Sequence, residues 1–313
     1  MSYKYLINGE EISNVIAPEW SDDIDSYANT FSFSTCEAYE VGSMFQIISE
    51  TGETVLKGLI TDFEQSEANI FHYSGYDCGF YINQNEIIEQ FKKIKISDAL
   101  TKLCQNYGIP VGTVPEISAT VTEIFKDKKL SDVFSQLIEY AKAKGAIKDV
   151  YFTCAKGQFD LLPYETITDL TGDMGIFSVA SQKTINSTNI KVSMQDLRNR
   201  VIIADNSDKN RKRVTVENTE SIGKYGLLQE VETIDTSKTN NLEKIASDKL
   251  STLNKLSKSI SLSMFGDYRM HKGVIMPIDC ELYGIKGDFL ITSSHHQPDG
   301  NVENVTVNLT MRE

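Results

Sequence analysis

Hydrophobic and polar residues alternate with a period of two through most of the first 76 positions. The clearest example is the segment 29–34, where phenylalanines alternate with small polar residues. Such alternation is typical of a β-strand with one buried and one exposed face. The segment 50–53 separates two such runs and contains Gly52, which suits the positive φ of a hairpin turn. The pattern predicts five or six strands here, as in a small barrel or sandwich.

The hydrophobic period becomes helical between residue 91 and about residue 170. The first predicted helix covers residues 97–108, with Ser97 as its N-cap and a glycine at its end. The second covers residues 131–145 and also ends at a glycine. A hairpin follows at 149–162, so the pattern predicts a small α+β unit. The predicted inward faces are Leu100, Leu103, Cys104 and Tyr107 in the first helix and Val133, Phe134, Leu137, Ile138 and Ala141 in the second.

Strand-like patterns return from Ile176 onward and predict a second β region. One helix interrupts it at 239–256, where seven residues form a stripe of the width expected for an ordinary buried face. The stripe consists of Leu242, Ile245, Ala246, Lys249, Leu250, Leu253 and Leu256. The predicted strands cover 190–192, 201–204, 214–216, 227–234, 260–265, 273–278, 287–292 and 304–311.

Charge is distributed unevenly along the chain, whose formal net charge is −13. Residues 1–90 contain 16 acidic and two basic residues (net −14), and the remainder contains 28 acidic and 29 basic residues (net +1). Phosphate contacts require lysine and arginine, so this region is not expected to bind nucleic acid. Its acidity indicates a solvated surface, a surface that repels DNA, or one that meets a basic partner. The basic cluster 209–213 is either a solvated hairpin tip or a contact for such an acidic surface.

Residues that could support catalysis or bind metal form no convincing pattern. His295 and His296 are adjacent, and neighbours on a strand point to opposite faces, which disfavours chelation. The carboxylates of Glu165 with Asp169, and those of the run 22–25, could pair as in a glycosidase. Such pairs are expected by chance among 44 acidic residues, and the run 22–25 lacks the glycine and distal glutamate of a calcium loop. We therefore predict no catalytic, cofactor-binding or metal-binding residues, and so no enzyme.

Cysteine usage and the apolar segments indicate the cellular compartment in which the chain is made. The five cysteines are odd in number, widely spaced and without a C-x-x-C pair, which predicts reduced thiols. The N-terminal segment 1–15 lacks the basic start and apolar run of a signal peptide. No apolar stretch approaches the roughly 20 residues that span a bilayer. We expect synthesis in the cytoplasm and no stable membrane insertion.

Four short blocks occur in a distinctive order: 97–110, ending in Tyr-Gly-Ile-Pro; 129–134; 220–229; and 285–291, followed by His296. In this order they resemble the hub proteins of contractile tails of phages, defective prophages and phage-tail-like bacteriocins, the late control protein D or spike-hub family. The resemblance covers nearly the whole chain, and its specificity comes from the order of the blocks.

This resemblance implies an α+β, mainly β fold with two small tube-type β-barrel domains and an intervening α+β domain. The expected domains are 1–90, 91–184 and 185–313, with helix 239–256 inserted in the last. A homotrimer would form a ring that joins the tail tube protein to the central spike protein, with the tape-measure protein as a further partner. The chain would pass from the cytoplasm of the producing bacterium into the assembled particle.

Two other classes of function stay open. A tail-associated cell-wall hydrolase would use the carboxylate pairs named above. A carbohydrate- or receptor-binding module would use some of the 14 tyrosines and 14 phenylalanines, although the chain has a single tryptophan, Trp20.

Overall fold

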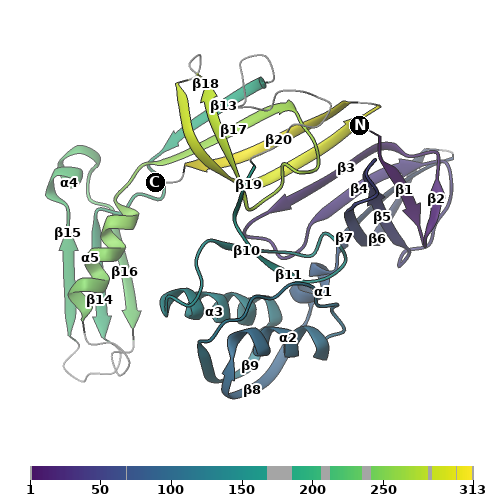
Figure 1. Cartoon of the computed structure of the whole chain (residues 1–313). Helices are drawn as coiled ribbons and strands as arrows, with labels where there is room; N and C mark the ends of the chain where they lie inside the picture. Colours follow the sequence, from purple (N-terminus) through teal and green to yellow (C-terminus); the bar gives the residue numbers. More distant parts are fainter. Residues whose placement is uncertain are drawn as a thin grey trace. The chain divides into compact units, whose positions relative to one another are not determined.

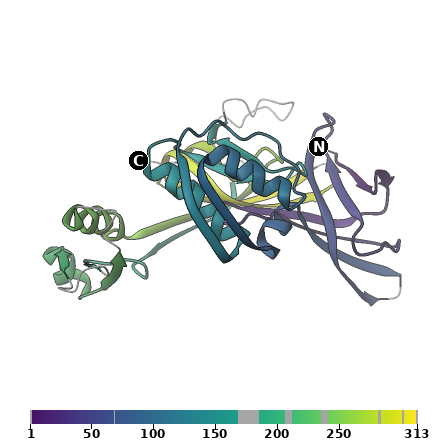
Figure 2. The same cartoon turned by 90° about the horizontal axis from the view of Figure 1, so that it is seen from below.

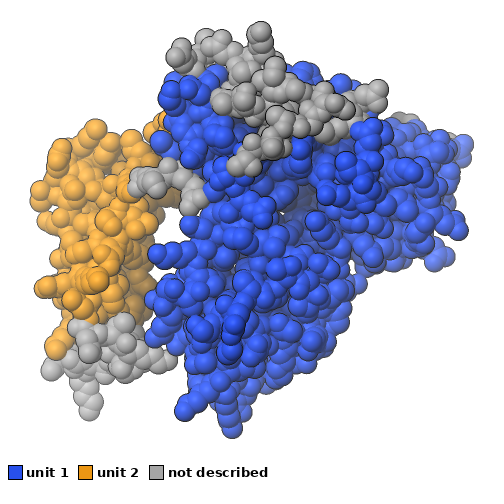
Figure 3. Space-filling view, viewed as in Figure 1, with its two compact units in different colours: residues 1–189, 261–313 blue, residues 190–260 orange. Residues whose placement is uncertain are grey.

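The computed structural model describes residues 2–67, 69–167, 185–205, 212–234, 241–280, 284–300 and 302–311. The chain forms two compact units (Figure 3). Unit 1 contains residues 1–189 and 261–313, and unit 2 contains residues 190–260. Strands predominate in the element order, so the predicted α+β, mainly β class is confirmed.

The N-terminal part of unit 1 is an antiparallel array in the order β3-β4-β7-β6-β5-β1-β2. Its inward side chains include Phe33, which stacks on Phe45 and Tyr73 with ring centroids 4.3 and 5.3 Å apart. The predicted hairpin at 50–53 is confirmed, with Gly52 at φ 85°. The strands are β1 (Lys4–Ile7), β2 (Glu10–Ile12), β3 (Ile16–Asp23), β4 (Thr30–Thr35), β5 (Met44–Ile48), β6 (Thr54–Glu67) and β7 (Ile70–Asp77).

The middle of unit 1 packs three helices against two small antiparallel sheets (Figures 1 and 2). The inward residues predicted for helices α2 and α3 are buried, except Tyr107, which packs partly buried on the same core. The predicted hairpin around 156–157 is also present. The elements are α1 (Gly79–Gln84), β8 (Glu86–Lys95), α2 (Ile96–Asn106), β9 (Thr120–Lys129), α3 (Leu130–Ala143), β10 (Val150–Thr153) and β11 (Asp160–Pro163).

The start of α2 corrects one prediction. Ser97 is not the N-cap, since the cap position is Lys95, whose backbone is extended and whose side chain makes no capping bond. Strand β8 runs directly into the helix, and the buried Ile96 fixes this entry by packing rather than by a capping hydroxyl. The ladder of β8 and β9 was not predicted, because register shifts between Ile87/Ile88 and Phe91/Ile94 break the period of two.

The C-terminal strands of unit 1 continue the large sheet in the order β13-β17-β20-β19-β3. Strand β19 pairs with β3 from Ser293↔Asp23 to His296↔Trp20, so both ends of the chain belong to one sheet. Strand β18 pairs with β19 and with the short β12. The strands are β12 (Glu165–Thr166), β13 (Ile185–Ser193), β17 (Ser257–Phe265), β18 (Val274–Cys280), β19 (Ile285–Asp299) and β20 (Val302–Met311), and β13 and β17 run from one unit into the other.

Unit 2 has its own three-stranded sheet, in the order β15-β14-β16, covered on one face by α5. We predicted that only the helix interrupts the second β region. Instead, three of the predicted strands form a separate sheet with that helix in unit 2. The reason is that Val201 and Ile203 of β14 are fully buried with Ala246 of α5, which closes a separate core. The elements are β14 (Arg200–Asp205), β15 (Arg213–Glu217), α4 (Thr219–Tyr225), β16 (Gln229–Ile234) and α5 (Leu242–Leu253).

Two predictions fall outside the described residues. They are most of the basic cluster 209–213, of which only Lys212 and Arg213 are described, and the part of the second β region that covers 176–184.

Candidate functional site

The large sheet of unit 1 presents one face that consists mainly of small polar side chains. Because side chains alternate along each strand, the residues next in sequence to the buried aromatic residues point to the opposite side of the sheet. The register aligns Glu19, Ser32, Ser74 and Asp62 in one row across β3, β4, β7 and β6. Ser34, His72 and Glu64 form the next row. We call this surface the polar sheet face.

The polar sheet face continues across the β3–β19 pairing into the C-terminal strands. Ser21 lies opposite His295, and their side chains are hydrogen-bonded at 2.7 Å. Ser32 donates to Glu19 at 2.8 Å, and the Nε2 atom of His295 lies 3.6 Å from the same carboxylate. Ser263 of β17 and Thr306 of β20 are linked at 2.8 Å. Hydrogen bonds therefore tie the face together across at least five strands.

Two shallow hollows lie on the polar sheet face. One of about 640 Å³ lies over β3, β4, β6 and β7, and one of about 290 Å³ lies at the join of β3 with β19 and β20. Among the described residues that line them there are carboxylates, hydroxyls, amides and histidines, but no lysine or arginine. A surface of this kind attracts no phosphate, because phosphate contacts depend on cationic side chains.

A buried polar cluster on the inward side holds the two ends of the sheet together. His296 is completely buried and stacks on Trp20 with ring centroids 4.9 Å apart. Its Nδ1 lies 2.6 Å from a Glu303 carboxylate oxygen, and its Nε2 lies 2.8 Å from the Ser294 hydroxyl. The hydroxyl of Tyr3 donates to the other oxygen of Glu303. Buried polar groups cost stability unless they are paired, and these four groups satisfy one another.

A second buried cluster joins the loop before β18 to the N-terminal strands. Lys272 is 1% exposed, and its Nζ donates to the carbonyl oxygens of Asp23 and Ser26 at 3.0 and 2.9 Å. Asp22 accepts from the backbone amides of Lys272 and Ser294 at 3.1 and 3.0 Å. Burial lowers the pKa of the Lys272 ammonium, because the charged form loses solvation.

Asp77 belongs to the same cluster and lies at the end of β7. Burial raises the pKa of its carboxyl to about 7, and the backbone amide of Gly79 and the charge of Lys272 oppose that rise. One Asp77 oxygen accepts from Gly79 at 2.9 Å, and the other has no hydrogen-bond partner in the described structure. This carboxyl therefore depends on the nearby ammonium for compensation.

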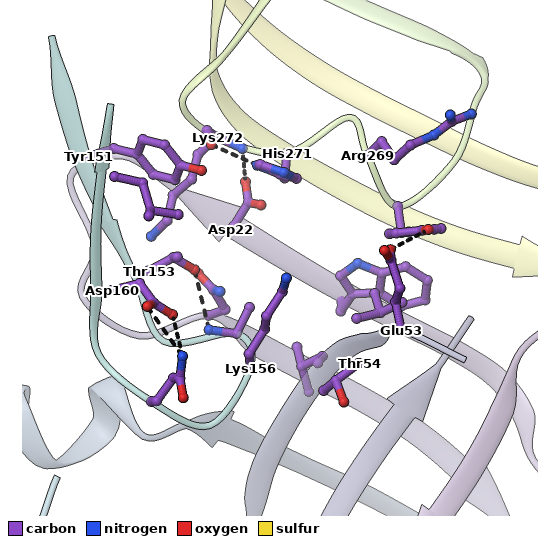
Figure 4. A pocket seen from close by; sticks show the side chains of 18 of the residues that line it. Asp22, Glu53, Thr54, Tyr151, Thr153, Lys156, Asp160, Arg269, His271 and Lys272 are labelled. Carbon is purple, nitrogen blue, oxygen red and sulfur yellow. Dashed lines mark hydrogen bonds between the residues drawn. The ribbon is translucent and has the colours of Figure 1, made fainter. Parts of the chain in front are cut away.

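A hollow of about 400 Å³ lies beside these clusters, between β3, the β5–β6 turn, the β10–β11 hairpin and the loop before β18. Figure 4 shows Lys156 reaching into it from the hairpin turn. Its carboxylates join parts of the chain: Asp160 accepts from the amide of Thr113 at 2.6 Å, and Glu53 accepts from the hydroxyl of Tyr268 at 2.7 Å. These two carboxylates of the hollow thus have structural partners.

Some of the residues considered as catalytic or metal ligands are described in the structure, and these have other orientations or structural partners. His295 and His296 point to opposite faces of β19, as predicted, with only His295 solvent-accessible. Asp22 is committed to two backbone amides, and Asp169 lies outside the described residues. The described residues contain no group of three or more His, Cys, Asp or Glu side chains arranged to hold a metal ion.

Sequence reasoning missed Lys272, Asp77 and Glu303. They stabilise the junction, by which we mean the region where the N-terminal strands meet β19, β20 and the loop before β18. Their partners are as many as 300 residues away in the chain, so no local signal marks them. No helix among the residues described in the structure is long and apolar enough to cross a bilayer.

The fold of this chain is that of phage and prophage tail proteins. It matches the 43 kDa tail protein of prophage MuSo2 from Shewanella oneidensis with a TM-score of 0.73, over 99% of this chain and 98% of that one, at 13% identity. The Escherichia coli protein c3393, described as a type VI secretion component structurally similar to the T4 tail proteins gp27 and gp5, matches with a TM-score of 0.59, over 99% of this chain and 77% of that one, at 8% identity.

The chain belongs to the YqbQ-like family, which matches residues 18–312. The phage-like element PBSX protein XkdQ of Bacillus subtilis (strain 168) is 18% identical over 263 residues, which are 82% of this chain and 78% of that protein. The resemblance to tail proteins that the ordered blocks indicated is thereby confirmed at the level of family and fold.

Proposed function

We propose that this chain is a structural hub of a phage tail or tail-like particle, in which a ring of copies connects the tail tube to the central spike. The observation that carries the proposal is the agreement in fold over 99% of the chain with tail proteins and with c3393, which is described as similar to gp27 and gp5. A hub requires a continuous rigid wall, and the β3–β19 pairing supplies one continuous sheet.

In this proposal the polar sheet face lines the channel of the ring. Genomic DNA or the tape-measure protein must pass such a channel without being held. The described residues that line its two hollows include Glu19, Asp62 and Glu64 and no lysine or arginine, so phosphate is repelled there rather than bound. For the same reason, this face would make no specific contact with nucleic acid.

The proposed domain organisation has one barrel in the N-terminal strands and a second in β17 to β20, with the α+β part between them in sequence. Unit 2 is then a separate insertion of the second barrel. Three copies would place six barrels in the ring, opposite a hexameric tube, with the spike on the other side. The chain acts without catalysis, which is consistent with the structural partners of its buried carboxylates.

Co-expression of this chain with the tube and spike proteins of its own gene cluster tests the proposal. We expect a complex with three copies of this chain, measured by light scattering after size exclusion and seen as a ring by electron microscopy. A strict monomer that binds neither partner would refute the proposal. Clearing of peptidoglycan in a zymogram would instead support a hydrolase, and binding to a glycan array would support a carbohydrate-binding module.

A further inference from the structure

The β8–β9 ladder is a surface of unit 1 that the proposed function leaves unused. In the described structure the two strands pair only with each other, so each has an edge without a strand partner. Their inward face packs Ile87, Phe91 and Phe125 into the core beneath α2 and α3. Their outward face carries Ile88 and Ile124, which are 72% and 53% exposed.

These two isoleucines form a small apolar patch rather than isolated exposures. Ile88 lies opposite Lys126, and Ile124 lies opposite Gln90 two positions along, so the isoleucines are diagonal neighbours. Diagonal neighbours on adjacent strands are close enough for their side chains to cover a common partner. Exposed apolar groups on strands with free edges are typical of sites that another chain covers.

Lysines outnumber acidic residues in the ladder around this patch, six to four, and the exposed acidic residues are Glu86, Glu123 and Asp127. The ion pairs that involve the ladder use Lys95 with Glu116 and Glu89 with Lys102. The remaining lysines of the ladder are exposed and form no ion pair with any other residue that the structure describes. They are Lys92, Lys93, Lys126, Lys128 and Lys129. The ladder therefore favours an occupant that is acidic and partly apolar.

The same chain presents such a surface in the loop between β4 and β5. Glu37 and Glu40 are exposed there, beside Val41 and Met44, which are 57% and 37% exposed. Glu10 lies close enough to raise the pKa of Tyr39 in this loop, although burial and the carboxylate of Glu37 contribute more. This loop belongs to the segment with net charge −14. We call it the acidic loop.

We propose that the β8–β9 ladder of one copy docks on the acidic loop of a second copy. Figure 1 places β8 and β9 at the lower end of unit 1 and β2, whose Glu10 lies near the acidic loop, at its right-hand end, so the two surfaces do not meet within one copy. A contact between two different surfaces of identical chains is heterologous, and it closes a ring when its rotation permits. The inference rests on the proposed function, because it supplies the contact between neighbours in the ring.

Charge reversal tests this contact in the full chain, alone and together with the tube and spike proteins. The double variant Lys92→Glu/Lys126→Glu should raise the concentration at which half of the trimer dissociates by about tenfold or more. Combining it with Glu37→Lys/Glu40→Lys should restore association, since both surfaces are then reversed. The wild-type trimer should also weaken as salt rises, because exposed ion pairs are screened.

The matched control is Lys142→Glu/Lys144→Glu, which makes the same change in charge at the exposed C-terminal end of α3. It should leave association unchanged. A trimer that tolerates the ladder variant as well as it tolerates the control overturns the docking inference and leaves the hub proposal intact. A wild-type chain that neither self-associates nor joins the tube and spike defeats the hub proposal itself. Failure of the combined variant to recover, while the single ladder variant stays folded, also overturns the pairing of these two surfaces.

Discussion

Replacing Lys272 by methionine should destabilise unit 1 strongly, because Lys272 is the buried cation of the junction. Methionine retains most of the side-chain volume but removes the ammonium. The carbonyl oxygens of Asp23 and Ser26 then lose their donor, and the carboxyls of Asp22 and Asp77 lose a compensating charge. The perturbation is therefore electrostatic rather than a large cavity.

The expected loss in the free energy of unfolding follows from these contacts. Removing one partner of a buried charged interaction costs about 3–5 kcal/mol, because the groups left behind stay buried without compensation. Each of the two hydrogen bonds donated by the ammonium accounts for about 1.5–3 kcal/mol on its own, which agrees with that range. We therefore expect the free energy of unfolding to fall by about 3–5 kcal/mol.

The assay is urea unfolding followed by circular dichroism, with Lys156→Met as the matched control. Lys156 enters the same hollow but is exposed, and no hydrogen bond or ion pair with another described residue holds its ammonium. The control should change the free energy of unfolding by about 0.5 kcal/mol or less, as for ordinary surface substitutions. Loss of the ammonium should also raise the pKa of Asp77 above its value of about 7, because that charge lowers it now.

A loss below about 1 kcal/mol for Lys272→Met, with the urea dependence unchanged, would refute the reasoning. It would mean that the buried carbonyls and carboxyls find other partners or water. A loss equal to that of the control would show that burial of this lysine is not what joins the loop to the N-terminal strands.

The other predictions concern pH, the second buried cluster and the polar sheet face. Asp77 has a pKa raised from 3.8 to about 7, so its contribution to stability is fully present below about pH 4 and is lost as pH rises through 7. Asp77→Asn should flatten the fall in the urea midpoint over that pH window. An unchanged pH profile would contradict the assignment to Asp77. Glu303→Gln should cost about 1–3 kcal/mol in urea unfolding, since His296 and Tyr3 lose a charged partner, whereas an effect under 0.5 kcal/mol would show that water replaces it. Ser32→Lys with Ser74→Lys should cost about 1 kcal/mol of stability, because Ser32 loses its hydrogen bond to Glu19 and the two lysines lie opposite each other, but should create salt-sensitive binding of a short DNA duplex in fluorescence anisotropy. Equal binding by wild type would contradict a phosphate-repelling face.

The period of two was enough to predict most strands of the N-terminal array, because each strand there has one buried and one solvated face. Phe31 and Phe33 are buried and Ser32 and Ser34 are accessible, as that alternation requires. The same rule failed for β8 and β9, where bulges displace the period within each strand. The helix-capping signal also failed at Ser97, because the helix begins at Ile96 with Lys95 in the cap position.

The separation of unit 2 shows a different limit. Its three strands and helix α5 were predicted individually, because each has a clear local period. Which sheet a strand joins depends on the partner that covers its apolar face, and β14 is covered by α5. That choice is made by contacts between segments 40 to 50 residues apart in the chain, which local patterning does not encode.

The sequence by itself determined the strand-rich class, the inward faces of α2 and α3, the acidity of the first 90 residues and the family to which the chain belongs. Each of these depends on local periodicity, on composition or on the order of short blocks. Only the tertiary structure decided that β3 pairs with β19, that Lys272 and His296 are buried at that junction, and that Glu19, Ser32, Ser74 and Asp62 align in one polar row across four strands. The physical reason is that burial and pairing of these groups arise from segments as many as 300 residues apart, and a charged side chain becomes structural only when such a segment excludes water from it.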